Sequence, residues 1–228
     1  MKHSGKARKS AFKLILISFI LLALILAAGV FAILAGTFIV GASVVLVTLW
    51  MLFAVFTLYF FRDPNPRVPV GAGLVLSPGH GRVDVIDRAK ETVFVGGECQ
   101  RVSIFLSVFN VHVQNAPVGG RVAFYQYTQG EFMNALKAEC ASANENALLG
   151  FEASDPPGRK IGVRLIAGAI ARRIVPFVQQ GEVVDRGQRI GLIQFGSRVD
   201  LYLPLDAQIR VKVGDRVVGG ETIVAAFE

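Results

Sequence analysis

Gly196-Ser197 is the pair of residues whose chemistry stands out in this sequence. It lies between two apolar runs with the alternation of β-strands, within Arg189-Ile-Gly-Leu-Ile-Gln-Phe-Gly-Ser-Arg-Val-Asp-Leu-Tyr-Leu-Pro204. A serine hydroxyl beside an unhindered glycine carbonyl can attack that carbonyl and exchange an amide for an ester, so the pair is a candidate for self-cleavage. A simple Gly-Ser turn or bulge is the alternative, and in isolation the dipeptide is more often that.

Two histidines and an arginine pair complete the candidate chemistry. His112 lies in Phe109-Asn-Val-His-Val-Gln-Asn-Ala-Pro117, and His80 lies in Leu76-Ser-Pro-Gly-His-Gly-Arg-Val83. Both side chains titrate near neutrality and so can move protons, although a histidine satisfied within a sheet or a turn is the structural alternative. Arg172 and Arg173 carry guanidinium groups that suit a phosphate or a carboxylate, or else the surface of an anionic membrane.

The N-terminal quarter of the chain is long enough and apolar enough for a membrane. The 48 residues between Lys13 and Arg62 carry no charge, whereas one crossing takes about 20 residues. We therefore expect a hairpin of two transmembrane helices, near Phe12–Leu34 and Ile39–Phe61, divided by glycines and small residues. The apolar run is much longer than the roughly 7 to 15 residues of a cleavable signal peptide, so we expect it to be retained.

The distribution of charged residues predicts which side of the membrane each part of the chain occupies. The chain has a net charge of +7, but five basic residues precede the apolar stretch, and the remainder holds 19 basic and 17 acidic residues. That balance argues against nucleic acid as a partner. Basic residues flank both ends of the apolar hairpin, which predicts an inner (cell) membrane protein with its N-terminus and soluble domain on the cytoplasmic side. Cys99 and Cys140 show no metal or redox spacing, and no metal site is expected.

We predict that the soluble domain is mainly β, within a chain of the α+β class. Prolines in Arg62-Asp-Pro-Asn-Pro-Arg-Val-Pro69 end the second expected helix, which divides the chain into an anchor, residues 1–61, and a domain, residues 62–228. Short apolar runs then alternate with glycine turns. Gly181-Glu-Val-Val-Asp-Arg-Gly-Gln-Arg-Ile-Gly-Leu-Ile193 is echoed by Gly214-Asp-Arg-Val-Val-Gly-Gly-Glu-Thr-Ile-Val-Ala-Ala226, a pattern similar to the turns of lipoyl-like, barrel-sandwich domains.

Taken together, these segments resemble the short form of phosphatidylserine decarboxylase, a self-processing enzyme. The resemblance rests on Phe60-Phe-Arg-Asp-Pro64, Phe105-Leu-Ser-Val-Phe-Asn-Val-His-Val113, Ile170-Ala-Arg-Arg-Ile-Val175 and the segment around Ser197. It runs from about the membrane segment to the C-terminus. Several motifs in the family's order make chance a poor explanation.

The resemblance implies a reaction and a cofactor. Ser197 would attack Gly196, and elimination of the ester would leave a covalent pyruvoyl group, the only cofactor expected. The precursor would become a β chain, residues 1–196, and an α chain, residues 197–228, which decarboxylate phosphatidylserine to phosphatidylethanolamine through a Schiff base. The expected partners are that phospholipid, the bilayer and the two chains of one precursor, with a homo-oligomer left open.

The resemblance also assigns roles, with one departure. The family has a functional histidine at the position of His112, which we expect to protonate the product carbanion. Where the family has Ser-Pro-Ala-Asp-Gly, this chain has Gly79 and His80. We interpret His80 as the base that activates Ser197, with help from Asp84 or impaired processing as the alternatives.

Three competing functions were weighed against this one. Loss of the family aspartate favours an unprocessed, catalytically inert homologue anchored in the membrane. A lysostaphin-like zinc peptidase needs about three protein ligands including histidines, and the soluble part offers two histidines with no His-x-His pair. A membrane-fusion adaptor needs a coiled-coil hairpin, and sustained heptads are missing from the sequence.

Overall fold

A computed structural model describes residues 6–131, 143–168, 173–194 and 197–228, with side chains from residue 15 onward. It divides into two compact units, Met1–Thr57 and Leu58–Glu228. The second unit therefore begins inside the last turn of the N-terminal helix, a few residues before the boundary predicted at residue 62. Each unit is described by itself below.

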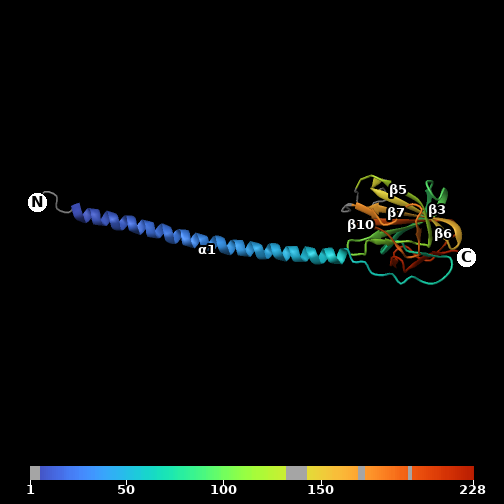
Figure 1. Ribbon diagram of the computed structural model, residues 1–228, viewed down its shortest axis with the longest axis horizontal. Coiled ribbons are helices and arrows are strands. Elements are labelled where there is room, and N and C mark those ends of the chain that lie inside the picture. Colours follow the sequence, from blue (N-terminus) through green and yellow to red (C-terminus); the bar gives the residue numbers. More distant parts are fainter. Residues whose placement is uncertain (1–5, 132–142, 169–172, 195–196) are drawn as a thin grey trace. The chain divides into compact units, whose positions relative to one another are not determined.

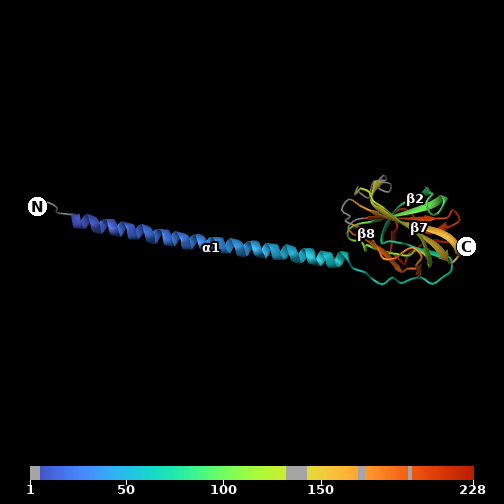
Figure 2. The ribbon, with the colours of Figure 1, turned by 45° about the horizontal axis from the view of Figure 1, so that its top comes forward.

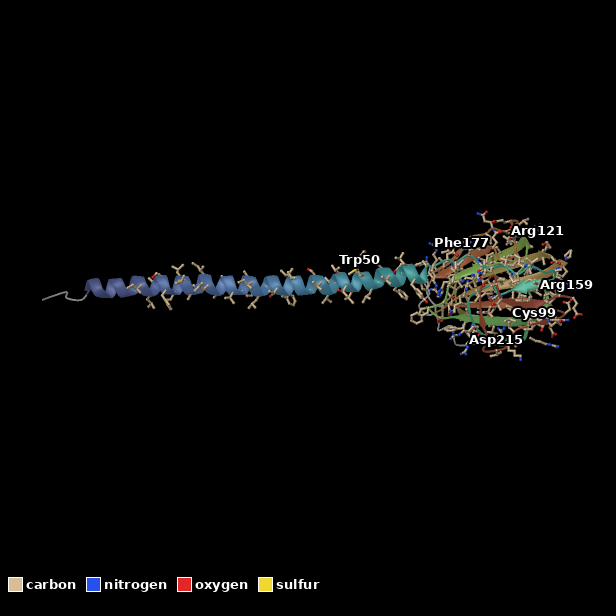
Figure 3. All side chains as sticks on the ribbon, turned by 90° about the horizontal axis from the view of Figure 1, so that it is seen from below. Trp50, Cys99, Arg121, Arg159, Phe177 and Asp215 are labelled. Atoms are coloured by element: carbon tan, nitrogen blue, oxygen red, sulfur yellow. The ribbon has the colours of Figure 1, made fainter. Side chains whose placement is uncertain are left out.

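One continuous helix, α1 (Lys6–Phe60), replaces the predicted hairpin, which was wrong (Figure 1). The 46 residues Ile15–Phe60 are apolar enough to cross a membrane, and side chains such as Trp50 project from the helix (Figure 3). The stretch lacks proline and charge, and Gly36 and Gly41 have open space around them. Glycine costs only about 1 kcal/mol relative to alanine inside a helix, so these positions do not break it.

The second unit is built from strands, which confirms the mainly β prediction. Their bounds are β1 Leu74–Leu76, β2 Gly81–Glu91, β3 Gly97–Leu106, β4 Val113–Asn115, β5 Gly120–Thr128, β6 Asn146–Ser154, β7 Pro157–Ala167, β8 Arg173–Pro176, β9 Val183–Val184, β10 Arg189–Gln194, β11 Ser197–Leu203, β12 Gln208–Ile209, β13 Arg216–Val217 and β14 Ile223–Ala226.

The strands form one large curled sheet and two small ones (Figure 2). The large sheet has the order β13-β2-β3-β11-β7-β6-β5-β9, and the small sheets have the orders β1-β14-β12 and β4-β10-β8. Neighbouring strands run antiparallel. The core lies between the large sheet and the small ones, because alternate residues such as Ile104, Leu165 and Val199 pack against Val75, Ile193 and Val224.

The glycine turns seen as an internal echo in the sequence share one geometry. Gly181 and Gly187 have φ angles of 95° and 82°, and their counterparts Gly214 and Gly220 have 99° and 72°. Side chains rarely adopt this left-handed region, so glycine is required at all four positions. The repeat is therefore structural, while the lipoyl-like assignment stays a prediction.

A second repeat pairs with the first. Ser77-Pro-Gly-His-Gly-Arg-Val83 matches Ala116-Pro-Val-Gly-Gly-Arg-Val122, 39 positions later. Val83 N donates to Asp215 O, 2.9 Å away, and Val122 N donates to Glu182 O, 2.8 Å away. Each segment is therefore hydrogen-bonded to one of the glycine turns in the same way. We call this arrangement the turn system: residues 77–83 with 214–220 form its first copy, and residues 116–122 with 181–187 form its second copy. His80 occupies in the first copy the place that Gly119 occupies in the second.

Candidate active site

Ser197 is the first residue of β11, held between two long strands. Its register partners are Leu106 in β3 and Ala167 in β7. The side chain is fully buried, and Oγ has no hydrogen-bond partner among the residues that the structure describes. A buried hydroxyl without a partner is costly and uncommon, although the hydroxyl of Ser103 in β3 is in the same state, so the role of Ser197 in cleavage stays a prediction. Gly196 lies outside the described residues.

His112 follows the loop that leaves β3 and is also fully buried. Nδ1 lies 2.9 Å from the carbonyl oxygen of Asn110. Because a carbonyl can only accept, Nδ1 carries the hydrogen, and Nε2 is the basic nitrogen of a neutral ring. Nε2 has no partner within the described part of the chain. Burial lowers the pKa of His112 to about 4, against the raising effect of the Asn110 carbonyl, with smaller lowering effects from Arg62 and His80.

His80 is half-buried in the turn that leads into β2. Ser77 Oγ donates to the carbonyl of Gly79 at 2.7 Å, which fixes the turn. The imidazole lies against Gly219, where an added Cβ would be 2.9 Å from Nε2. Burial is the main cause that lowers the pKa of His80, followed by the opposing effect of Glu221. The ring is therefore neutral at pH 7 and able to accept a proton.

The turns that carry the two histidines lie against the strands on either side of residue 197. The His112 carbonyl accepts from Ile193 N at 3.2 Å, near the end of β10. Gly79 packs against Leu106, the register partner of Ser197, and against Val199, two residues beyond it. The structure therefore brings His80, His112 and Ser197 to one end of the core.

The last turn of α1 closes this site. The ring of Phe60 is fully buried and stacks on the His112 imidazole, with centroids 4.2 Å apart. Tyr59 Oη donates to the carbonyl of Phe109 at 3.2 Å, and an Arg62 guanidinium nitrogen donates to the same carbonyl at 2.7 Å. These contacts fix the loop that precedes His112 and exclude water from one face of its ring.

The help of Asp84 in activating Ser197 stays a prediction. One oxygen of its carboxylate forms an ion pair with Arg198, the residue that follows Ser197, and Oδ1 has no hydrogen-bond partner in the described part of the chain. Arg198 is buried. Burial raises the pKa of Asp84, and the guanidinium of Arg198 opposes that rise. The pair anchors the start of β11 from the face of the sheet opposite the core.

The arginine pair predicted to bind substrate is only partly described. Arg173 is exposed at the start of β8, where its register partner is Gln194 in β10. Arg172 lies outside the described residues. Substrate binding by this pair stays a prediction.

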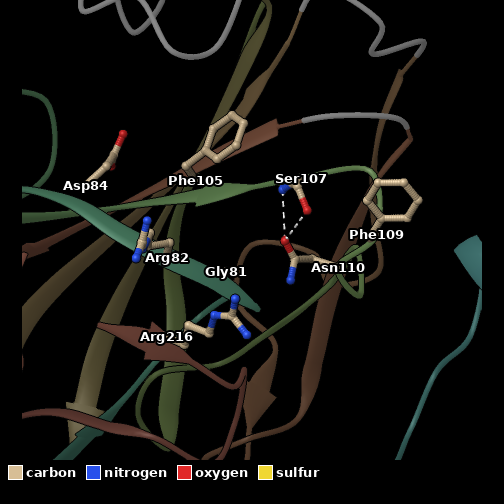
Figure 4. A pocket seen from close by; sticks show the side chains of 8 residues that line it. All are labelled: Gly81, Arg82, Asp84, Phe105, Ser107, Phe109, Asn110 and Arg216. Atoms are coloured by element: carbon tan, nitrogen blue, oxygen red, sulfur yellow. Dashed lines mark hydrogen bonds between the residues drawn. The ribbon is translucent and has the colours of Figure 1, made fainter. Parts of the chain in front are cut away.

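A pocket of about 570 Å³ lies next to the site, on the other face of β3 (Figure 4). It is lined by Gly81, Arg82, Asp84, Phe105, Ser107, Phe109, Asn110 and Arg216. Phe105 and Ser107 flank Leu106, the strand neighbour of Ser197. The pocket is large enough for the head of a small-molecule or lipid ligand.

Sequence reasoning missed three of these features. Phe60 and Arg198 stand inside the motifs that carried the resemblance, but only the fold shows that one packs on His112 and the other pairs with Asp84. Arg82 belongs to the segment around His80, and its match with Arg121 in the second copy was a signal available in the sequence.

Comparison with known proteins agrees with this geometry. The family model described as phosphatidylserine decarboxylase matches residues 53–225. A phosphatidylserine decarboxylase proenzyme of Desulfotalea psychrophila is 44% identical over 180 residues, which cover 79% of this chain and 83% of that protein. Proteins of the same name from Symbiobacterium thermophilum and Pelobacter propionicus are 44% and 42% identical, over 75% and 77% of this chain and 79% of each relative.

These matches include β11 with Ser197, both histidines and the last turn of α1, so they cover the whole site described above. The relatives are carboxy-lyases made as precursors. The chain belongs to the phosphatidylserine decarboxylase family of enzymes.

Proposed function

We propose that the protein converts phosphatidylserine to phosphatidylethanolamine and carbon dioxide, using a pyruvoyl group made from its own Ser197. The observation that carries the proposal is the buried Ser197 Oγ, without a hydrogen-bond partner in the described part of a chain that matches this family. The residues fit the group. A pyruvoyl group is no larger than serine, and residue 197 is held in register on both sides by β3 and β7.

Self-cleavage begins at Ser197 Oγ. His80 accepts the hydroxyl proton as Oγ bonds to the carbonyl carbon of Gly196, and the peptide nitrogen leaves that carbon, so an ester replaces the amide. Elimination then breaks the bond between Cβ and Oγ. Water adds to the resulting dehydroalanine end and ammonia leaves, which completes the new group. The second copy of the turn has Gly119 in place of His80, so the turn itself does not require an imidazole.

The new chain end stays in place after the cut. β11 is paired along its whole length with β3 on one side and along most of it with β7 on the other, and the α chain also supplies β12, β13 and β14. The ion pair between the buried Arg198 and the partly exposed Asp84 holds the residue next to the modified one.

Decarboxylation needs a proton at two moments. The pyruvoyl group supplies the electron sink for the loss of carbon dioxide. His112 Nε2, basic in the neutral ring, accepts a proton from the ammonium group of the substrate and returns it to the carbon that lost the carboxylate. The Phe60 ring keeps water from one face of His112 and limits its motion.

We also place the catalytic domain on the cytoplasmic side of the cell membrane. Arg62 and Arg67, which follow the apolar helix directly, favour this side, because basic residues beside a span tend to remain in the cytoplasm; if the single helix spans the membrane once, the five basic residues at the N-terminus oppose it. The N-terminus was expected on the same side because the apolar stretch was predicted to turn back as a hairpin. The single helix has no such turn, so this reason no longer holds. Protease mapping of residue 228 in intact and opened cells tests the placement.

The direct test is to supply the purified protein with phosphatidylserine vesicles and measure phosphatidylethanolamine and released carbon dioxide. The parent should form both, and Ser197→Ala should form neither. His112→Ala should be cut normally but lose about 10²- to 10⁴-fold in rate, the usual value of a positioned acid-base group. Equal turnover by Ser197→Ala would refute the proposal, and full activity of His112→Ala would remove that residue from the mechanism.

A further inference from the structure

Two arginines face the same pocket from paired strands. Arg82 in β2 and Arg216 in β13 are register partners, and both line the cavity beside β3 (Figure 4). Like charges directly opposite each other on neighbouring strands are destabilising. Within the described ranges, no ion pair involves either guanidinium. Both side chains are exposed and Arg82 Nε donates to the carbonyl of Gly214 at 3.0 Å, but no carboxylate of the described residues neutralises the two adjacent positive charges.

The second copy of the turn system shows how the same position looks without this arrangement. There the equivalent of Arg82 is Arg121, which forms a 2.8 Å ion pair with Glu152 on the next strand. Its other register partner is Val183. In the first copy, Phe105 stands where Glu152 would be and Arg216 stands where Val183 would be. The turn therefore folds without an arginine pair. The additional positive charge of Arg216 in the first copy is consistent with a negatively charged ligand from outside the chain.

The other polar groups of the pocket also favour an anion. The side-chain oxygen of Asn110 accepts from Ser107 N at 2.9 Å and from Ser107 Oγ at 2.7 Å. The amide nitrogen of Asn110 is left as a donor, on the side of Arg216 (Figure 4). One carboxylate oxygen of Asp84, which also lines the pocket, pairs with Arg198, while Oδ1 has no hydrogen-bond partner in the described part of the chain. Two guanidinium groups and an amide donor suit the oxygens of a phosphate group.

The pocket is apolar on its remaining sides and opens near the end of the apolar helix. Phe105 and Phe109 line it, and the Phe109 side chain is 64% exposed. The carbonyl of Phe109 accepts hydrogen bonds from Tyr59 and Arg62, the residues at the end of α1. The pocket thus combines two positive side chains with an exposed aromatic side chain, near the end of the apolar helix. This combination suits the charged headgroup of a phospholipid.

We propose that this pocket binds the phosphodiester group of the phospholipid substrate, with Arg82 and Arg216 as its cationic ligands. The proposal rests on the function proposed above and replaces no part of it. Phe105 and Ser107 line the pocket on either side of Leu106, which pairs with Ser197, so a phosphate held there lies against the strand next to the reacting residue, across the sheet from the Ser197 side chain.

Steady-state kinetics with phosphatidylserine test the site. Arg216→Gln should raise KM by roughly 10- to 100-fold, the loss expected for one charge-assisted hydrogen bond, with kcat nearly unchanged and self-cleavage complete by mass. The matched control is Arg121→Gln, the equivalent position in the other copy, where an exposed ion pair is lost and KM should change less than about twofold. A KM of Arg216→Gln close to that of the parent would overturn the proposal. So would an equal rise in both variants, which would indicate general surface charge.

Binding without turnover separates this proposal from the proposed function. In the Ser197→Ala background, which cannot react, calorimetry with a soluble short-chain phosphatidylserine should show Kd raised by a similar factor in Arg216→Gln and unchanged in Arg121→Gln. Inorganic phosphate should bind more weakly than the lipid and depend on the same arginine. If the parent lacks decarboxylase activity while these Kd shifts persist, only the proposed function fails. If the parent is active and Kd does not respond to Arg216, only the pocket assignment fails.

Discussion

The ring of Phe60, in the last turn of the apolar helix, stacks on the imidazole of His112 with centroids 4.2 Å and planes 30° apart. The contact joins residues more than 50 positions apart in the chain. It makes the end of the helix a wall of the active site, because Phe60 belongs to the same compact unit as the sheet. The helix therefore has a role beyond attachment to a membrane.

Phe60→Ala should shift the pH dependence of decarboxylation. Burial lowers the pKa of His112 to about 4, so the neutral, proton-accepting ring and the activity that needs it are lost only as the pH falls through about 4. Opening one face of the ring to water should raise this pKa toward the ordinary 6.5, and the acid limb of kcat should move up by as much as about two pH units. Stopped-assay rates from pH 4 to 8 measure the shift. An unchanged acid limb in a folded Phe60→Ala variant would show that the stacking does not tune His112.

Two N-terminal deletions should behave differently. A chain that begins at Leu58 keeps Tyr59, Phe60 and Arg62, whereas one that begins at Arg62 leaves the Phe60 site empty. Removal of a buried phenylalanine costs about 3–5 kcal/mol, so the shorter chain should unfold at a clearly lower temperature. Thermal unfolding followed by circular dichroism compares them. Equal midpoints would mean that the last helical turn adds nothing to the domain.

Gly219→Ala should slow self-cleavage without unfolding the protein. The added Cβ would lie 2.9 Å from His80 Nε2 and 2.8 Å from the side-chain oxygen of Asn115, so the imidazole must move. Gly97→Ala is the control, since an added Cβ there meets nothing within 4 Å. The rate at which freshly synthesised precursor is cut, followed on denaturing gels, should fall for Gly219→Ala alone. Normal cutting by that variant would argue against His80 as the base.

Much of the fold could be predicted from local sequence. The repeated glycine pattern that contains Gly181 and Gly187 predicted turns at these positions, and both residues adopt the left-handed backbone that favours glycine. The sequence wrongly predicted two helices, because Gly36 and Gly41 were interpreted as a break. Each glycine costs a helix only about 1 kcal/mol, so the helix continues through both. Without charge or proline between Lys13 and Arg62, the local signal for a turn was too weak.

The site shows the same division between local and distant information. The apolar alternation predicts strands on both sides of Ser197, whereas the structure includes Ser197 in the second of them as its first residue. The partners of Asp84 and His112 do not follow from the alternation, because they depend on which strands pair and on where the helix ends. Asp84 is expected on the same face of the strand as His80, but its ion pair with Arg198 could be seen only in the fold.

The mass of the purified protein under native conditions tests the central claim most directly. We expect two chains, residues 1–196 and 197–228, with the second lighter by one ammonia than a fragment that begins with serine. Ser197→Ala should remain one full-length species, His80→Ala should stall as precursor, and His80→Asp should be cut at least as well as the parent. A parent protein found as a single 24.6 kDa chain with Ser197 intact would contradict the account and identify an inert member of the family.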